Sequence, residues 1–258
     1  MKVPGIDIAD IQESGEIDGG ELLLVLENSN LRLKSIDQAK GFYKIFSPTR
    51  MLSALVASST ASCTSGVVTV AATAHGISSN AAFTGCEFYY PGSPSLAAGW
   101  YPNYARIGVD SISFSAPGVA NFASESVNSG NAFVDEVTVA SVTIPANVLL
   151  PSTYVEIPFF RASGSAAGTK THKLKIGSSA IVTIANTSTS LVIGLSSLGF
   201  VVSAPGKAVG HVSQIGTLAG TATPVTFDPS VAQTISITHQ VSAATLFIYS
   251  SVMALRAT

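Results

Sequence analysis

Apolar residues along the chain come in short runs that are separated by clusters of Gly, Pro, Ser and Asn. The alternation is clearest at 107–114, where Ile112 and Phe114 share one face of an extended segment and Ser111 and Ser113 share the other. No stretch of ten or more residues combines the 3.6-residue apolar period of a helix with capping residues. This pattern predicts an all-β fold, either a sandwich or a barrel.

The first fifty residues contain one clear β signal. Residues 21–34 read as a short apolar strand, an Asn-Ser-Asn turn and an alternating strand from Leu31 to Lys34. This order predicts a small hairpin. The segment is too small to enclose a core of its own, so we expect residues 1–50 to dock on another part of the assembly.

Residues 51–133 contain short strand candidates separated by turns. The β-branched and aromatic runs at 66–70 and 86–90, together with the alternating run at 107–114, predict three strands of a small β module. Between them, residues 91–104 are rich in Pro and Gly, and we expect an irregular loop there. Residues 134–258 form the third predicted unit.

The third unit contains a regular series of strand candidates. They lie at 137–144, 154–160, 171–176, 180–185, 190–195, 234–238 and 245–255. Short strands separated by Gly, Pro and Ser turns predict an antiparallel β-sandwich. No solenoid repeat or coiled-coil heptad is present in the sequence, so this chain alone does not predict a fibrous shaft.

Charge is scarce and unevenly placed. Of the 258 residues 11% are charged, and the 58 Ser and Thr residues outnumber the 28 charged ones. Half of these charges, 8 acids and 6 bases, lie in residues 1–50. A charge-poor, hydroxyl-rich surface suits a chain that contacts copies of itself, because charged residues are depleted from the cores of interfaces.

The composition also argues against several functions. A net charge of −2 and a pI near 6.1 provide no basic surface for nucleic acid. The apolar run Leu22–Leu26 has five residues, where a membrane span needs about 20. The acidic first twenty residues lack the apolar centre of a secretory signal. The motifs of serine hydrolases, zinc proteases and thiol redox proteins are absent from the sequence.

No cofactor or metal site is predicted. The four histidines, His75, His172, His211 and His239, are not at metal-ligand spacing from one another or from Cys, Asp or Glu. We expect His239 to end its strand. An ion on the axis of a trimer stays open, because sequence spacing cannot reveal such a site.

The two cysteines and the few carboxylates also leave alternatives open. Cys63 and Cys86 can form at most one disulfide, and either free thiols or a bridge fits the sequence. A sugar-cleaving enzyme needs two carboxyl groups on either side of the bond it cleaves. Asp135 and Glu136 are neighbours and would point to opposite faces of a strand, so nothing in the sequence points to such an enzyme.

An aromatic cluster is the most informative local feature. Within 18 positions the chain carries Tyr89, Tyr90, Trp100, Tyr101, Tyr104 and Arg106. Flat aromatic rings with polar tips stack on sugars and anchor interfaces. We therefore name Trp100, Tyr101, Tyr104 and Arg106 as candidate ligand-binding residues. The alternative is that these rings pack in the core or between subunits.

The third unit resembles the C-terminal jelly-roll domains of bacteriophage tail fibres. The resemblance rests on three runs in the same order, 139–150, 170–177 and 227–238, followed by the closing run 245–255. The hairpin at 21–34 looks like the short particle-docking segments that open such proteins. The runs 73–76 and 90–101 look like modules of phage tail proteins. Together these patterns cover about half of the chain.

The resemblance implies a homotrimeric, non-enzymatic virion protein. It would be a short tail or baseplate fibre, assembled in the host cytoplasm, that adheres to a host surface glycan or protein. Residues 1–50 would bind other tail or baseplate proteins. One alternative is a purely structural head decoration or collar protein, and a third reading is a capsule-degrading tailspike enzyme.

Overall fold

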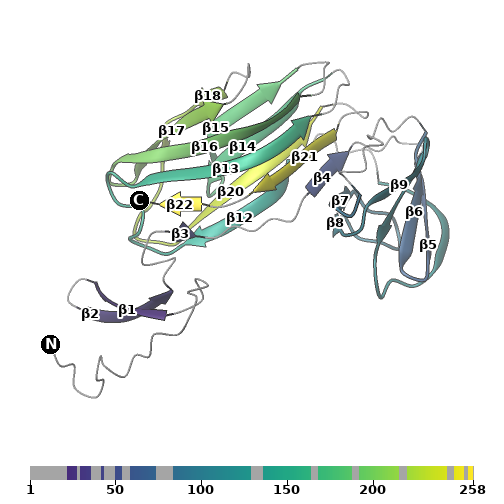
Figure 1. The fold of residues 1–258 in the computed structure, drawn as a ribbon, viewed down its shortest axis with the longest axis horizontal. Coiled ribbons are helices and arrows are strands. Elements are labelled where there is room, and N and C mark those ends of the chain that lie inside the picture. The colour runs from purple at the N-terminus through teal and green to yellow at the C-terminus, as the bar shows by residue number, and fades with distance from the viewer. Residues whose placement is uncertain are drawn as a thin grey trace.

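A computed structural model of the chain describes residues 22–27, 30–35, 42–43, 50–53, 59–73, 84–128, 136–163, 168–187, 192–214, 220–242, 247–252 and 255–257. Every regular element in these ranges is a strand, so the predicted all-β class is confirmed. The described residues contain no helix long and apolar enough to cross a membrane. Figure 1 shows a large sandwich, a smaller β module beside it and the separate first hairpin.

The predicted N-terminal hairpin is present. Strand β1 (Leu22–Glu27) pairs antiparallel with β2 (Asn30–Ser35), and Leu24 lies opposite Leu33. The next short strand, β3 (Phe42–Tyr43), pairs with the last strand of the chain, β22 (Leu255–Ala257). The end of the predicted docking segment therefore joins a sheet of the sandwich.

The small module is built on a five-stranded sheet. In spatial order its strands are β11 (Phe122–Ser126), β5 (Thr60–Thr64), β6 (Val67–Ala71), β10 (Ser111–Ser115) and β9 (Ala105–Gly108). The prediction of one strand over 107–114 is wrong. The chain turns at Val109 and Asp110, so β9 and β10 form a hairpin and Val109 is 72% exposed.

Two strands extend from this module into the large sheet. Strand β7 (Glu87–Tyr90) pairs antiparallel with β8 (Gly99–Tyr101) and parallel with β4 (Arg50–Ser53). The expected irregular loop at 91–104 is thus partly regular. Its Gly99–Tyr101 stretch is extended and pairs with Phe88–Tyr90, in spite of the Pro and Gly residues around it.

The sandwich is formed by two sheets. One has the order β12 (Val137–Ile144), β20 (Gln233–Val241), β14 (Lys170–Ile176), β15 (Ser179–Asn186) and β18 (Gly220–Ala222). The other has the order β19 (Val225–Thr226), β17 (Lys207–Gln214), β16 (Val192–Ala204), β13 (Tyr154–Ser163) and β21 (Phe247–Val252), and continues into β4, β7 and β8. Strand β17 was not predicted.

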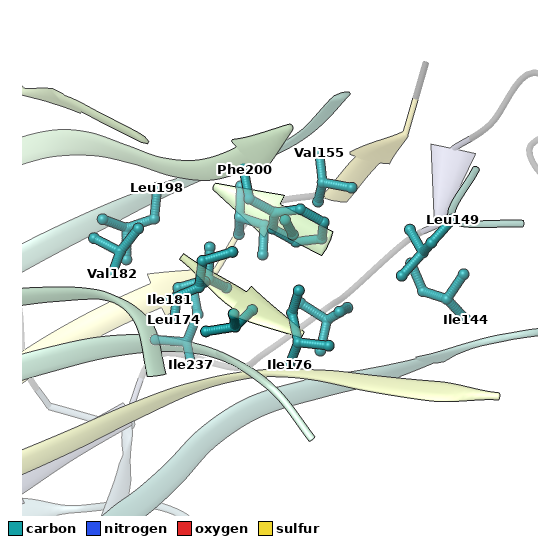
Figure 2. Close-up of a cluster of buried hydrophobic side chains, with 14 of the residues drawn as sticks. Ile144, Leu149, Val155, Leu174, Ile176, Ile181, Val182, Leu198, Phe200 and Ile237 are labelled. Carbon is teal, nitrogen blue, oxygen red and sulfur yellow. The ribbon is translucent and has the colours of Figure 1, made fainter. Parts of the chain in front are cut away.

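The centre of the sandwich interior is apolar, and a few polar side chains, among them Lys170, His172 and His239, are also buried. Residues from both sheets meet in it, among them Val155, Leu174, Leu198, Phe200 and Ile237, each at most 1% exposed. Figure 2 shows these side chains pointing toward one another between the sheets. The alternation of buried and half-buried positions along β14 produces this arrangement, because successive residues point to opposite faces. The predicted C-terminal, jelly-roll-like antiparallel sandwich is confirmed.

A second, separate core fills the small module. It contains Met51, Val68, Phe88, Ile112 and Phe114, all at most 1% exposed. Cys63 and Cys86 also belong to this cluster as free thiols. Burial raises the pKa of the Cys86 thiol to about 12, which keeps it protonated at neutral pH.

Candidate functional site

The four residues of the predicted aromatic site lie in different environments. Tyr104 is 1% exposed and its ring stacks on Phe88 in the module core, with centroids 5.7 Å apart. Burial raises the pKa of its hydroxyl. A ligand in solution cannot reach this ring, so Tyr104 is a packing residue, as in the alternative that the sequence left open.

Trp100 lies where the module meets the sandwich. Its indole Nε1 donates a hydrogen bond to the carbonyl oxygen of Thr138 at 3.2 Å, at the start of β12. The ring of Tyr89 meets the indole edge-on at 5.2 Å. The guanidinium carbon of Arg50 lies 5.0 Å from the centre of the indole, a cation–π contact. Through Thr138, Trp100 therefore links the module to the sandwich.

Arg50 completes this junction. Its Nε donates to Glu87 Oε2 at 2.7 Å, and its Nη1 donates to the carbonyl oxygen of Val139. One guanidinium thus binds β7 of the module, β12 of the sandwich and the ring of Trp100. A planar, permanently charged group with five donors suits this position, because it can bind several partners at once.

Tyr101 and Arg106 are both half-buried and both bonded locally. The Tyr101 hydroxyl donates to the carbonyl oxygen of Ala97 at 2.9 Å, and its ring packs on Phe114 at 5.1 Å. Arg106 Nε donates to the carbonyl oxygen of Gly108 at 2.9 Å. The structure therefore does not gather the four residues on one surface. A ligand contact by Trp100, Tyr101 or Arg106 stays a prediction.

A different surface combines exposed apolar and polar groups. It is the outer face of β13, β16 and β17, turned away from the sandwich interior. Tyr154, Val201 and Val209 lie directly opposite one another in the strand register and form a row across the three strands. We call these three residues the outer row. Val201 and Val209 are 38% and 37% exposed.

A polar pair borders the outer row. Glu156, Gly199 and His211 form the next row of the same strands. The Tyr154 hydroxyl and His211 Nε2 are 2.6 Å apart, and the two rings are tilted against each other at 5.0 Å. Burial of the tyrosine, with a smaller contribution from the charge of Glu156, raises the pKa of the Tyr154 hydroxyl.

Gly199 makes room for this pair. A Cβ atom at this position would lie 2.2 Å from His211 Cε1 and 2.4 Å from the carbonyl oxygen of Val155, so the imidazole lies directly over the glycine backbone. Beside it, the Ser197 hydroxyl donates to Glu156 Oε1 at 2.6 Å. The face therefore presents fixed hydrogen-bonding groups next to an apolar strip.

No metal centre is found in the part of the chain that the structure describes, where no group of three or more His, Cys, Asp or Glu side chains converges. The expectation that His239 ends its strand is wrong. His239 lies inside β20 and is buried, and it contacts His172, which is 67 positions away in the sequence.

The sequence matches no protein-family model and no curated protein. Two solved structures are distantly similar. The galectin LEC-6 of Caenorhabditis elegans is 14% identical, over 48% of this chain and 95% of its own, with a TM-score of 0.25. The alginate lyase of a Corynebacterium species is 15% identical, over 80% of this chain and 96% of its own, with a TM-score of 0.28. At these values neither comparison bears on what this chain binds.

Proposed function

We propose that the chain is a virion structural protein, a short bacteriophage tail or baseplate fibre that trimerises and adheres to the host cell surface. The observation that carries the proposal is the outer face of β13, β16 and β17, where the outer row lies beside the Tyr154–His211 pair. Apolar strips beside fixed polar groups are typical of surfaces that bind sugars or proteins.

The distribution of charge supports the same proposal. Residues 1–50 hold half of the charged residues and would attach the chain to other tail or baseplate proteins. The remaining 208 residues are charge-poor and rich in Ser and Thr, which suits association with copies of the same chain. In a trimer, three weak sites would act together and produce avidity without a strong single contact. This mechanism needs no catalytic group.

One observation favours a second candidate, a head decoration or collar protein without receptor binding. Trp100, the strongest anchor type of the aromatic cluster, is engaged inside the molecule with Arg50, and both residues bind β12. If the outer face also serves only contacts between subunits, the protein is purely structural. The two candidates differ in whether the assembled protein labels host cells.

The test uses the full chain in two steps. Light scattering measures the mass in solution, and the same fluorescently labelled sample is then applied to candidate host cells. We expect a trimer that labels cells and a loss of labelling in Val209→Asp, which places a charge in the outer row. Thr234→Asp is the matched control, because Thr234 is an exposed residue of β20 in the opposite sheet.

The other outcomes decide against the proposal in different ways. A stable monomer contradicts the fibre function. A trimer that labels no cell supports the structural candidate. Equal loss of labelling in Val209→Asp and Thr234→Asp shows that the outer row is not the adhesive site. Release of reducing sugar from host polysaccharide identifies an enzyme.

A further inference from the structure

The outer face of β13, β16 and β17 presents two parallel rows of side chains. Alternate residues of these strands, among them Val155 and Phe200, are buried in the core, so the residues between them point outward. The outer row is followed along the strands by a second row, which consists of Glu156, Gly199 and His211. Two residues of a strand separate the rows, which places them about 7 Å apart. An apolar strip and a polar strip thus lie side by side.

The apolar strip is aliphatic. Val201 and Val209 lie opposite each other on neighbouring strands and are 38% and 37% exposed. Neighbouring strands are about 4.8 Å apart, so the two side chains form one continuous surface. A ligand that covers this strip must itself have a face of C–H groups, because the removal of apolar surface from water is what favours such a contact.

The Tyr154–His211 pair keeps one polar hydrogen for a ligand. The phenol and the neutral imidazole together have two polar hydrogens. The contact of 2.6 Å between the hydroxyl and Nε2 uses one of them, whichever group donates. The other hydrogen is then on Nδ1 or on the hydroxyl. In either arrangement the pair can donate to an oxygen atom of a ligand.

Glu156 provides an acceptor beside this donor. Its Oε1 accepts from the Ser197 hydroxyl at 2.6 Å, which fixes the orientation of the carboxylate. A carboxylate has about four acceptor positions on its two oxygens, so a ligand can use the others. Gly199 is the register partner of Glu156, and the imidazole of His211 lies over this glycine. The donor and the acceptor are therefore neighbours in the second row.

A sugar ring has the features that this face requires. One side of a pyranose ring carries C–H groups, and its edge carries hydroxyl groups that both donate and accept. An extended peptide would instead add to a free strand edge. Strand β16, in the middle of the face, is paired on one side with β13 and on the other with β17, so the centre of the face offers no such edge.

We propose that the outer face binds a pyranose ring of a host surface glycan, with the C–H face of the ring on Val201 and Val209 and its hydroxyl groups on Glu156 and the Tyr154–His211 pair. This assignment rests on the proposed adhesive function and adds the class of ligand and the role of each side chain. The carboxylate of Glu156 accepts from a hydroxyl group and repels another carboxylate, so it selects the hydroxyl edge of a sugar.

Saturation-transfer NMR of the full chain tests the assignment. The probes are the methyl glycosides of glucose, galactose, mannose, N-acetylglucosamine and rhamnose. Glycerol is the reference compound, because it has hydroxyl groups but no ring face. We expect transfer from the protein to the C–H protons of at least one glycoside and none to glycerol.

Two variants locate the bound sugar. Glu156→Gln should weaken the binding of that glycoside by about tenfold or more, because hydrogen bonds to a charged group are stronger than those to a neutral one. Val209→Asp should abolish the transfer. Glu125→Gln is the matched control, since Glu125 also accepts from a serine, Ser95, but lies in the module. It should bind the glycoside as the wild type does, and circular dichroism shows whether each variant is folded.

These results are independent of the trimer and of cell labelling. If the protein labels cells through the outer row but binds none of the glycosides, the proposed function stands and the sugar assignment is overturned. Glycoside binding that folded Glu156→Gln and Val209→Asp proteins retain places the sugar elsewhere and also overturns the assignment. Glycoside binding by a stable monomer, lost in both variants, supports the assignment and contradicts the fibre function alone.

Discussion

The indole of Trp100 connects two parts of the chain that are distant in sequence. Its N–H bonds to Thr138 and its face receives Arg50, and Arg50 in turn binds Glu87. The ring therefore contributes through both packing and a directed hydrogen bond. At the scale of single residues, the only tryptophan of the chain thus links β8 to β12 and β4.

Removal of the ring should loosen the junction. We expect Trp100→Ala to lower the free energy of unfolding by about 1–3 kcal/mol, since a half-buried ring and one hydrogen bond are lost. Urea unfolding measures the change, and small-angle scattering should show a wider distribution of distances between the module and the sandwich. Trp100→Phe keeps an aromatic ring and should lose less. An unchanged Trp100→Ala protein contradicts this role.

At the scale of elements, Glu136 ties the start of β12 to β14 across the intervening strand β20. Its carboxylate accepts from Lys173 Nζ at 2.5 Å and from Lys175 Nζ at 2.8 Å. Burial alone would raise the pKa of Glu136, but the hydrogen bonds from the two lysines outweigh it and lower the pKa to about 2. Lys173 and Lys175 lie on the outer face of β14, whereas Leu174 and Ile176, which alternate with them, fill the inner face.

The pH dependence of this contact follows from the lowered pKa. Its contribution is fully present above the ordinary carboxyl value of 4.5 and is lost as the pH falls toward about 2. We expect Glu136→Gln to lower the stability at pH 7 by about 1 kcal/mol after solvent screening, and to reduce the decline between pH 5 and pH 3. Urea titrations at these values measure both effects.

Glu125→Gln is the control for this prediction. Glu125 is a half-buried residue of β11 in the small module and bonds to Ser95. Its replacement should leave the unfolding of the sandwich unchanged. If Glu136→Gln is as stable as the wild type at pH 7, the bridge from β12 to β14 does not stabilise the fold.

At the scale of the whole molecule, two hydrophobic cores lie on either side of the Arg50 junction. One fills the sandwich and the other fills the module. Strands β4, β7 and β8 extend the large sheet into the module, so the two units share hydrogen bonds but keep separate interiors. A substitution in one core should therefore lower the stability of that unit and leave the stability of the other unit largely unchanged.

Calorimetry of paired core variants tests this separation. We expect Leu174→Ala to destabilise the sandwich by about 2–5 kcal/mol, because it leaves a cavity in the core. Val68→Ala should destabilise the module in the same way but by less, because it removes a smaller side chain. Each variant should lower the temperature of one unfolding transition and leave the other in place. A single transition that shifts equally in both variants shows that the two cores unfold as one unit.

Local pattern was sufficient for most strands of the sandwich. The runs at 171–176 and 137–144, predicted as strands between turn residues, correspond to β14 and β12. Pattern failed at 107–114, where a turn at Val109 and Asp110 interrupts an apparently continuous alternation. It also missed β17, whose glycine and polar positions obscure the period.

The candidate site could not be predicted from local pattern, because its residues come together only through the register of the paired strands. Tyr154 and His211 are 57 positions apart and meet only because β13, β16 and β17 pair side by side with Gly199 between them. His172 had a signal in the sequence that was not used. It follows the same alternation as Leu174 and Ile176, which places it on the buried face.

By itself, the sequence determined the all-β class, the first hairpin and most strands of the sandwich, since these depend on the period and type of neighbouring residues. Tertiary structure decided which aromatic rings are buried, which residues form the outer row and that His172 meets His239. The physical reason is that strand pairing joins residues far apart in the chain, and one step of register exchanges the buried and exposed faces of a strand.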